Sequence, residues 1–357
     1  MSKTVLVIGT GTIGEPLIGL LARLKVELGI DRVIFHKRTP LDYEVAKVNS
    51  LISQGADLVV DEDQVENFLK LGHEVTHTLE QALEVSQVVI DCTPAGNDNK
   101  DLLYQTHTDN SDKVFIAQGS EKGFGFPFAW GINDAELIKE EPCFVQVVSC
   151  NAHAMSRIMF SLSGGELSTI AAGDFVCIRR ANDASQDEGF IPAPRGDIHS
   201  DLEFGTHHAR DVSDLFLTKT NSVLPIFSSA LKVNSQYMHM VRFSLVLNEQ
   251  LSEADILERF FTDVFVATTS HKSSNRVFSF GRDHGFYGRI YNQTVICMPS
   301  LFTSSLPDAR TQVTGFSFTP QDGNSLLSSV AAAMYGLYGN DYLAKLDPIK
   351  RFLIDEV

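Results

Sequence analysis

The chain has 357 residues, a hydrophobic fraction of 43% and a formal net charge of −16 at pH 7. The acidic balance disfavours a nucleic-acid partner, which normally requires a basic face, and no apolar run approaches the roughly 20 residues that a membrane-spanning helix needs. Five cysteines without Cys-x-x-Cys spacing indicate free thiols in a reducing compartment rather than a disulfide framework or a metal site. Because the start of the chain has no signal-peptide layout, a cytoplasmic protein is expected.

The first part of the chain alternates predicted strands with predicted helices. A β-rich apolar run and a glycine-containing turn lead into a helix whose apolar residues recur at helical spacing. Later strands are expected within 31–39, 88–96 and 113–123, and helical stretches within 63–72 and 78–87. This alternation predicts an α/β fold with a Rossmann-type, doubly wound parallel sheet.

The pattern changes after Cys150. Partial alternation predicts longer strands of a mixed or antiparallel sheet within 168–183, 234–250 and 274–283. The stretch 181–211, rich in Asp, Gly, Pro and His, is expected to be an extended loop that serves a site or an interface. Residues 323–339 are expected to form one helix.

A chain of 357 residues exceeds the size at which a single hydrophobic core usually keeps growing, so two domains are expected. The first is a dinucleotide-binding domain over 1–149, completed by a C-terminal helix within 320–345. The second, over 150–319, is an α+β domain for catalysis, substrate binding and oligomerisation.

A glycine motif occupies the first strand-to-helix turn. Gly9, Gly11 and Gly14 have the spacing Gly-x-Gly-x-x-Gly directly after a strand and before a helix, the context that the dinucleotide-binding fingerprint requires. Gly9 permits the tight turn, Gly11 lets the backbone approach a pyrophosphate, and Gly14 lets the helix pack closely on the sheet. The alternative is a tight turn that binds no ligand. The expected cofactor set also includes Thr12, Ile13, Thr93 and Gly119.

The second strand ends in His36, Lys37 and Arg38. A site for NAD usually carries an acidic residue here that binds the ribose 2′-hydroxyl, whereas a cation suits a 2′-phosphate. Lys37 and Arg38 therefore predict a preference for NADP, with NAD as the second cofactor. The alternative is that both are solvated surface charges.

Cys150 lies between a predicted buried strand and a segment suited to open a helix. Oxidation of an aldehyde becomes easier when a thiolate first adds to the carbonyl, because the thiohemiacetal then releases a hydride. A helix N-terminus here would lower the thiol pKa. Cys92 and Cys177 lie in apolar runs and are expected to be packing residues. The alternative for Cys150 is the same structural role, since free cysteine is among the most buried residue types.

The order of these motifs resembles the archaeal-type (type II) phosphorylating glyceraldehyde-3-phosphate dehydrogenase family over nearly the whole chain. The family's Ser-Cys-Asn block matches Ser149, Cys150 and Asn151. Other matching segments are GTGTIGEPL (9–17), KRTPLDYEV (37–45), GADLVV (55–60), VVIDCTPAGNDNKD (88–101), FIAQGSEKG (115–123), IRRAND (178–183), GTHHARDV (205–212) and ALKVNSQYMHM (230–240). Each match is short, but their shared order is specific.

The resemblance implies roles for individual residues. Cys150 would be the nucleophile, His239 the general base that accepts the thiol proton, and Asn151 the group that fixes the acyl oxygen. Arg179 and Arg180 would grip phosphate oxygens or lie against the nicotinamide, with Arg179 assigned to the cofactor and Arg180 to the substrate.

The same resemblance places His207, His208 and Ser149 at the substrate anion site, together with Asn151. Each residue alone also has a structural alternative. His239 could be a hydrogen-bonded core histidine, His207 and His208 could be solvated, and the arginines could form an exposed strand end. Their arrangement around a thiol and a nucleotide motif favours function.

Four segments depart from the family's pattern. Ala152 and His153 replace two threonines whose hydroxyls bind phosphate, and Ala209 and Arg210 replace Gly-Pro. Val241 replaces a second histidine, and Thr-Gly-Phe-Ser replaces His-Gln-Glu-Ser at 314–317. The sequence therefore specifies the dehydrogenase architecture more firmly than the substrate.

The expected protein is an NADP-preferring enzyme that oxidises glyceraldehyde 3-phosphate through a thioacyl intermediate at Cys150 and transfers the acyl group to inorganic phosphate. Family members are usually homotetramers, so a homotetramer is expected. One alternative is a semialdehyde dehydrogenase or an acyl-CoA or acyl-phosphate reductase using the same covalent route. The other is a nucleotide-binding paralogue without turnover.

Overall fold

The computed structural model describes residues 2–108, 112–119, 121–182, 189–320 and 322–357. The chain divides into two compact units. The first unit comprises Met1–Phe128, Leu137–Val147 and Ser328–Pro348, and the second comprises Ala129–Glu136, Val148–Leu327 and Ile349–Val357.

The first unit is built on a parallel sheet of eight strands in the order β4-β3-β2-β1-β5-β6-β8-β7. The order runs in opposite directions from β1 and β5, which makes this pair the switch point where doubly wound sheets bind ligands. The strands are β1 (Thr4–Ile8), β2 (Arg32–His36), β3 (Asp57–Val60), β4 (His77–Thr78), β5 (Val88–Asp91), β6 (Val114–Gln118), β7 (Phe126–Phe128) and β8 (Phe144–Val147).

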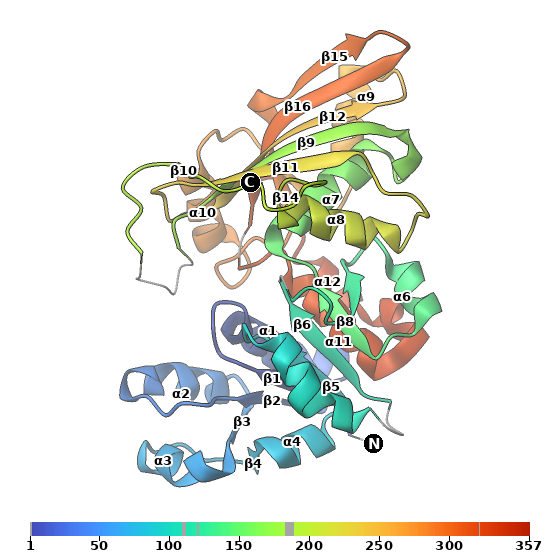
Figure 1. Cartoon of the computed structure of the whole chain (residues 1–357). Coiled ribbons are helices and arrows are strands. Elements are labelled where there is room, and N and C mark those ends of the chain that lie inside the picture. Colours follow the sequence, from blue (N-terminus) through green and yellow to red (C-terminus); the bar gives the residue numbers. More distant parts are fainter. Residues whose placement is uncertain (1, 109–111, 120, 183–188, 321) are drawn as a thin grey trace. The chain divides into compact units, whose positions relative to one another are not determined.

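Helices pack along this sheet because its strands are apolar on both faces (Figure 1). They are α1 (Gly14–Leu28), α2 (Val45–Ser53), α3 (Val65–Lys70), α4 (Leu79–Val85), α5 (Gly96–Asn99), α6 (Asp134–Glu140) and α11 (Leu326–Tyr338), with short helical turns at Asp42–Glu44, Glu62–Gln64, Lys100–Tyr104, Gln105–His107 and Gly339–Lys345. The approach of α11 is close, since a Cβ at Gly336 would lie 2.6 Å from Val88. The predicted Rossmann-type sheet and the predicted C-terminal helix are both confirmed.

The second unit is built on a mixed sheet in the order β10-β11-β9-β12-β16-β14-β13, with β15 on β16. The pairs β9 with β11 and β13 with β14 are parallel, and the other pairs are antiparallel. The strands are β9 (Ile170–Arg179), β10 (Arg195–Gly196), β11 (Ile226–Lys232), β12 (His239–Leu247), β13 (Val266–Thr269), β14 (Thr294–Cys297), β15 (Phe302–Leu306) and β16 (Arg310–Thr319). The predicted mixed sheet is confirmed.

The helices of the second unit are α7 (Cys150–Leu162), α8 (His207–Leu217), α9 (Glu253–Thr262), α10 (Ser274–His284) and α12 (Asp347–Lys350), with short turns at Leu167–Thr169 and Met298–Ser300. Helix α7 is buried along most of its length and packs with α8 and α9 on one face of the sheet (Figure 1). Alternate residues of β9 and β12 supply the apolar partners on that face.

Two expectations for the second unit are wrong. Residues 274–283 form helix α10 rather than a strand, because the buried Val277 and Gly281 are one helical turn apart and Gly281 packs against Ile290. Residues 207–211 of the predicted loop belong to α8, whose first turn is capped from another element, since Ala209 N donates to Ser228 Oγ of β11. Residues 183–188 of that loop lie outside the described part of the chain.

Among the described helices, none combines the length and apolar character required to cross a bilayer.

Candidate active site

The glycine turn of the first unit has the shape of a phosphate cradle. Gly9 has a φ of 96°, and a Cβ at Gly14 would lie 2.1 Å from the Gly9 carbonyl oxygen, so neither position tolerates a side chain. A Cβ at Gly11 would meet nothing within 4 Å, which leaves open space beside the backbone. The residue before α1 is Ile13, whose apolar side chain cannot cap the first turn of that helix. The turn therefore presents a helix N-terminus suited to an anion.

The loop after β5 lies against this turn. The Thr93 methyl group would be 3.1 Å from a Cβ at Gly9. The buried carboxylate of Asp91 accepts hydrogen bonds from Thr93 N at 2.8 Å, Thr93 Oγ1 at 2.7 Å, Asn99 Nδ2 at 2.7 Å and the Tyr104 hydroxyl at 2.6 Å. Burial and then the Asp91 charge raise the pKa of Tyr104, so the phenol stays a donor. Sequence reasoning missed Asp91, although a carboxylate ending an apolar strand is itself a signal.

The two predicted 2′-phosphate cations have different surroundings. The Lys37 ammonium is nearly buried and forms an ion pair with Glu44, whereas Arg38 is exposed. Glu44 also accepts from Lys47 at 2.6 Å, and Lys47 Nζ lies 3.5 Å from the Thr10 carbonyl of the glycine turn. Burial raises the pKa of Glu44, but hydrogen bonds from both lysines outweigh it and the net pKa is lowered. Glu44 and Lys47 are additional candidates that the sequence did not single out.

Gly119 follows β6, with a φ of 74° and its N–H bonded to the Val147 carbonyl at 2.9 Å. Its own carbonyl accepts from Gln146 Nε2 at 3.1 Å. Nine of the ten predicted cofactor residues belong to the first unit and follow the carboxyl ends of β1, β2, β5 and β6: Gly9, Gly11, Thr12, Ile13, Gly14, Lys37, Arg38, Thr93 and Gly119. The tenth, Arg179, ends β9 of the second unit.

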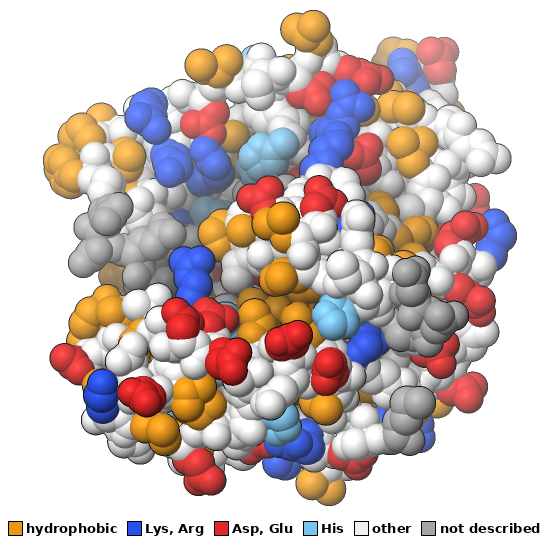
Figure 2. Space-filling view, turned by 60° about the horizontal axis from the view of Figure 1, so that its bottom comes forward, with side chains coloured by type: hydrophobic (Ala, Val, Ile, Leu, Met, Phe, Trp, Pro, Cys, Tyr) orange, Lys and Arg blue, Asp and Glu red, His pale blue; other side chains and the backbone are white. Residues whose placement is uncertain are grey.

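Two cavities of the first unit lie outside the glycine turn. One, of about 380 Å³, opens beyond the carboxyl ends of β3 and β4, with a floor of Leu79, Leu83 and Leu103 and acidic neighbours Asp61 and Glu62. Figure 2 looks onto the lower face of Figure 1, where acidic side chains surround exposed hydrophobic ones.

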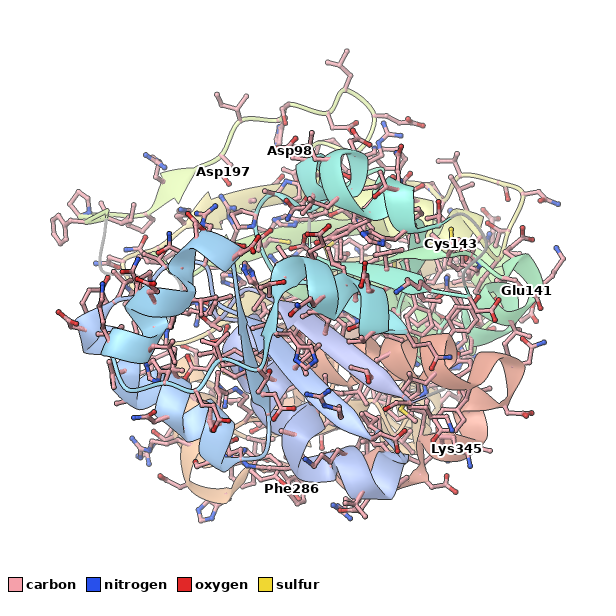
Figure 3. All side chains as sticks on the ribbon, turned by 90° about the horizontal axis from the view of Figure 1, so that it is seen from below. Asp98, Glu141, Cys143, Asp197, Phe286 and Lys345 are labelled. Carbon is pink, nitrogen blue, oxygen red and sulfur yellow. The ribbon has the colours of Figure 1, made fainter. Side chains whose placement is uncertain are left out.

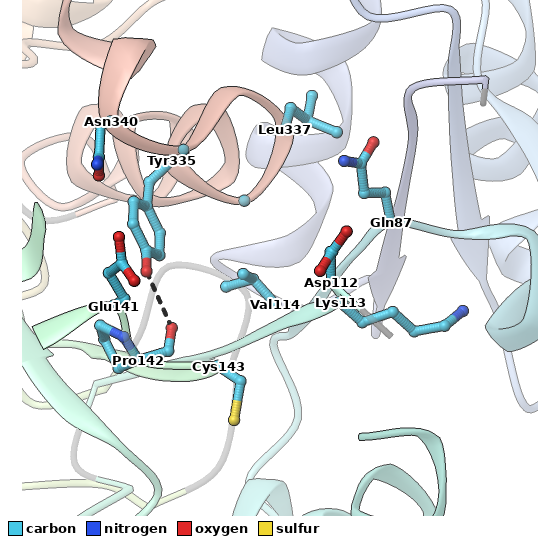
Figure 4. A pocket seen from close by; sticks show the side chains of 12 residues that line it. Gln87, Asp112, Lys113, Val114, Glu141, Pro142, Cys143, Tyr335, Leu337 and Asn340 are labelled. Atoms are coloured by element: carbon cyan, nitrogen blue, oxygen red, sulfur yellow. Dashed lines mark hydrogen bonds between the residues drawn. The ribbon is translucent and has the colours of Figure 1, made fainter. Parts of the chain in front are cut away.

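The other cavity, of about 510 Å³, lies at the amino ends of β6 and β8 beside α11 (Figure 4). Its lining residues include Glu141 and Cys143, both labelled in Figure 3. Because ligands of parallel α/β sheets bind at the carboxyl ends, this larger cavity is not the nucleotide site.

In the second unit, Cys150 is the first residue of α7. Ser149 caps this helix, its hydroxyl accepting from Ala152 N at 3.4 Å. Cys150 is half-buried, and the helix N-terminus stabilises a thiolate at this point. Asn151 is buried, and its Oδ1 has no hydrogen-bond partner among the described residues. That orphaned oxygen and the neighbouring thiol make this turn the best candidate for chemistry.

His239 is the first residue of β12, and one of its ring nitrogens is hydrogen-bonded to the backbone. Arg180 N donates to His239 Nδ1 at 2.9 Å. Because a backbone N–H only donates, Nδ1 accepts, and the neutral ring carries its hydrogen on Nε2. Burial and then the neighbouring cations lower the pKa of His239 to about 3, so the ring is neutral at physiological pH. In this state His239 offers a hydrogen-bond donor.

Both predicted arginines have carboxylate partners. Arg179 forms an ion pair with Asp197. The buried Arg180 guanidinium lies 3.3 to 3.5 Å from the carboxylate oxygens of Asp322. An anion that binds either arginine therefore competes with an aspartate, and the clearest contact of Arg180 with the predicted site is its backbone bond to His239.

The two adjacent histidines begin α8, and their rings lie 3.9 Å apart between centroids. Burial and then Arg179 lower the pKa of His207, and burial, His207, Arg179 and His239 lower the pKa of His208 well below its usual value. Neither ring nitrogen of the buried His208 has a hydrogen-bond partner in the described part of the chain. Arg179, His207, His208 and His239 thus lie within electrostatic range of one another and form a region suited to an anion.

Asn324 connects Cys150 to the same end of the sheet. Its Nδ2 donates to the Cys150 carbonyl at 2.9 Å and to the Gln293 carbonyl at 3.0 Å. Gln293 immediately precedes β14, and β14 pairs with β16, where Thr319 lies opposite His239. The structure therefore brings Cys150 and His239 to one end of one sheet.

The departures from the family's pattern also have structural explanations. His153 is fully buried, and its Nδ1 lies 3.1 Å from the Ser149 carbonyl. Burial lowers the pKa of His153 to about 4, so the ring is neutral and supports the turn rather than presenting a charge. Ala152 and Val241 are core residues, and Arg210 pairs with Asp201 at 2.9 Å. Positions 152 and 153, where the family has threonine hydroxyls, thus carry buried side chains that pack in the core.

No family model matches this sequence. It is 28% identical over 261 residues to a glyceraldehyde-3-phosphate dehydrogenase of Pyrobaculum calidifontis, covering 71% of this chain and 69% of that protein. The enzyme of the same name from Pyrobaculum neutrophilum is 27% identical over 78% of this chain and 77% of its own. That of Sulfolobus acidocaldarius is 26% identical over 83% of this chain and 82% of its own.

Over most of its length the chain is similar to several archaeal enzymes named glyceraldehyde-3-phosphate dehydrogenase. This confirms the resemblance inferred from the order of motifs. The name of these relatives denotes oxidoreductases that act on an aldehyde. The match to the Sulfolobus acidocaldarius enzyme covers 83% of this chain, so it includes parts of both units.

Proposed function

We propose that this chain is a glyceraldehyde-3-phosphate dehydrogenase that forms a covalent intermediate at Cys150 and transfers the acyl group to inorganic phosphate. The observation that carries the proposal is the position of Cys150, at the N-terminus of α7 and at the end of the sheet where His239 lies. The similarity to archaeal dehydrogenases supports the reaction class.

A nicotinamide nucleotide would be held by the first unit, where Gly9 and Gly14 permit the close turn, Gly11 leaves open space for a pyrophosphate and the N-terminus of α1 follows. The rest of the bound nucleotide would lie along Thr12, Ile13, Thr93 and Gly119, and its ribose would lie beside Lys37 and Arg38. When bound, the nucleotide supplies a hydride acceptor.

The residues of the second unit would perform the steps on the aldehyde. The Cys150 thiolate forms a bond to the carbonyl carbon, the C=O π electrons move to oxygen, and the Nε2–H of His239 stabilises the negative charge that develops on that oxygen. Loss of hydride from that carbon breaks the C–H bond and leaves a thioester. Attack by a phosphate oxygen then breaks the C–S bond and releases the acyl phosphate and the thiolate.

His239 has a different role here from the general base expected of the family. A base must accept the thiol proton through a free lone pair, but Nδ1 accepts from Arg180 N and Nε2 carries the ring hydrogen. We therefore assign His239 the role of a neutral hydrogen-bond donor. The α7 N-terminus supplies the stabilisation of the thiolate.

Arg179, His207 and His208 would bind the anionic groups of the substrate and of the attacking phosphate. Asn151 Oδ1 and the Ser149 hydroxyl lie on the same turn as Cys150 and would orient the bound aldehyde. Arg180 would act through His239, because its guanidinium is fully buried against Asp322, whereas the guanidinium of Arg179 is partly exposed beside Asp197.

The test is a panel of phosphorylated and unphosphorylated aldehydes, followed by NADPH absorbance with and without inorganic phosphate. We expect glyceraldehyde 3-phosphate to be oxidised, and the rate to rise with phosphate. Oxidation of another aldehyde, or no effect of phosphate, would transfer the assignment to a semialdehyde dehydrogenase or acyl-CoA reductase. Nucleotide binding with no oxidation of any aldehyde would leave a paralogue without turnover.

We also propose that NADP is preferred over NAD. Because Lys37 and Arg38 would pair with the 2′-phosphate, the double variant Lys37→Met/Arg38→Met is expected to raise the Kd for NADPH about tenfold, while the Kd for NADH changes less than about twofold. Fluorescence titration of both nucleotides measures this ratio. The exposed Lys70 of α3 supplies the control variant Lys70→Met, which should change neither Kd. Equal increases in the Kd for NADPH and for NADH would show that Lys37 and Arg38 do not bind a 2′-phosphate.

A cytoplasmic homotetramer completes the proposal. The face of the second sheet that lies opposite α7 carries half-exposed residues such as Val176 and Arg242, and Phe316 is exposed there. Such a broad strand surface is suited to association between copies of this chain.

A further inference from the structure

A chain of buried polar contacts runs from Cys150 to the middle of α7. Arg157, two turns beyond Cys150, is fully enclosed, with 2% of its surface exposed. Its Nε donates to Gln293 Oε1 at 2.8 Å, and its Nη1 lies 3.2 Å from Asp263 Oδ2. The guanidinium also stacks 4.4 Å from the centre of the Phe265 ring. Gln293 is therefore held by a buried cation that is itself paired with a carboxylate.

Asn324 joins this network to the nucleophile. The two hydrogens of its Nδ2 are directed at two backbone carbonyls, those of Cys150 and Gln293. Its orientation is unambiguous, because a flipped amide would place Oδ1 against two carbonyl oxygens. Asn324 itself is held by a bond from its N–H to the Pro320 carbonyl at 2.8 Å.

We propose that Asn324 is a positioning residue that sets the location of Cys150 relative to its reaction partners. Within α7 the Cys150 carbonyl belongs to the helix ladder, which fixes the helix but not its placement along the sheet. The Asn324 bridge ties that carbonyl to the start of β14, beside the strand that pairs with His239. The proposal rests on the proposed function of Cys150 as nucleophile.

The reaction rate depends steeply on the position of the reacting group. A reacting group displaced by about one ångström loses a large part of its advantage, up to about a hundredfold in rate. Loss of the Asn324 bridge leaves two buried carbonyls with fewer donors, and the first turn of α7 shifts to recover them. Loss of Asn324 should therefore lower the reactivity of Cys150 more than it lowers the stability of the fold.

The experiment measures alkylation of Cys150 by iodoacetamide, mapped by peptide mass spectrometry between pH 6 and 9. The variant Asn324→Ala is expected to slow alkylation about tenfold at pH 7 and to move the midpoint of its pH profile. The kcat should fall by a similar factor, with the aldehyde KM within about twofold. If Asn324→Ala does not fold, Asn324→Ser is measured in its place, because serine keeps a small polar side chain of shorter reach.

A matched control separates positioning from stability. The buried Thr311 hydroxyl also makes two hydrogen bonds in the second unit, donating to Glu249 O at 2.9 Å and accepting from Leu251 N at 2.8 Å. Thr311→Val should lower the Tm without slowing alkylation of Cys150. Equal slowing in both variants, or no slowing in Asn324→Ala, overturns the inference. If instead Cys150 of the unaltered chain reacts no faster than the exposed Cys143, it is the nucleophile assignment that fails.

Discussion

The variant Cys150→Ser is expected to lower kcat/KM for aldehyde oxidation by at least about 1,000-fold, because a serine hydroxyl at this position lacks a base to ionise it. The α7 N-terminus stabilises a thiolate but does not ionise a hydroxyl, and the nearby His239 has its Nδ1 lone pair occupied by Arg180 N. Stopped-flow or steady-state NADPH formation measures the loss. Binding of NADPH should be unchanged, since the nucleotide motif lies in the first unit.

A second cysteine provides the matched control for that experiment. Cys143 is exposed and precedes β8 in the first unit, so Cys143→Ser should keep full activity. If Cys150→Ser retains more than about a tenth of the activity, the covalent route through this thiol is wrong and a direct hydride transfer must be considered.

The variant Arg157→Met is expected to lower the free energy of unfolding by about 3 kcal/mol, because it leaves a largely buried carboxylate without its cation. Asp263 would keep bonds from the Ser161 hydroxyl at 2.5 Å and from Phe265 N at 3.0 Å, which limits the loss to the lower part of the range for buried pairs. Urea denaturation followed by circular dichroism measures it. Adding Asp263→Asn should recover part of the loss, since the unpaired charge is then removed.

An exposed ion pair of the same unit supplies the comparison. Arg242 lies 2.8 Å from Asp174, with side chains 34% and 54% exposed. Arg242→Met should therefore cost less than about 1 kcal/mol. Similar losses for Arg157→Met and Arg242→Met would mean that burial does not govern the contribution of the pair.

Several local features of the fold follow from the sequence because they depend on neighbours in the chain. The glycine turn, the parallel strands of the first unit and helix α11 have periodicities and turn residues that act over a few positions. The helix at 274–283 does not follow from its neighbours in the chain. The short apolar run of these residues fits a strand or a helix, and only packing against Ile290 selects the helix.

The resemblance predicted which residues form the candidate site and what each would do, but not the contacts that fix their states. Cys150, His239 and the His207–His208 pair each carry a chemical signal in the sequence. The partners that define their state do not, because Asp322 and Asn324 lie more than a hundred residues along the chain from Arg180 and Cys150. The donor role of His239 likewise depends on a backbone bond from Arg180.

The sequence by itself determined the dinucleotide motif, the α/β class and the thiol at the start of α7, since short-range periodicity and side-chain chemistry suffice for these. The tertiary structure alone decided which carboxylates occupy the two arginines, which tautomer His239 adopts, and that Asn324 holds Cys150. Those outcomes depend on burial and on contacts between distant segments, and such contacts form only when the sheet of the second unit brings β12, β14 and β16 together.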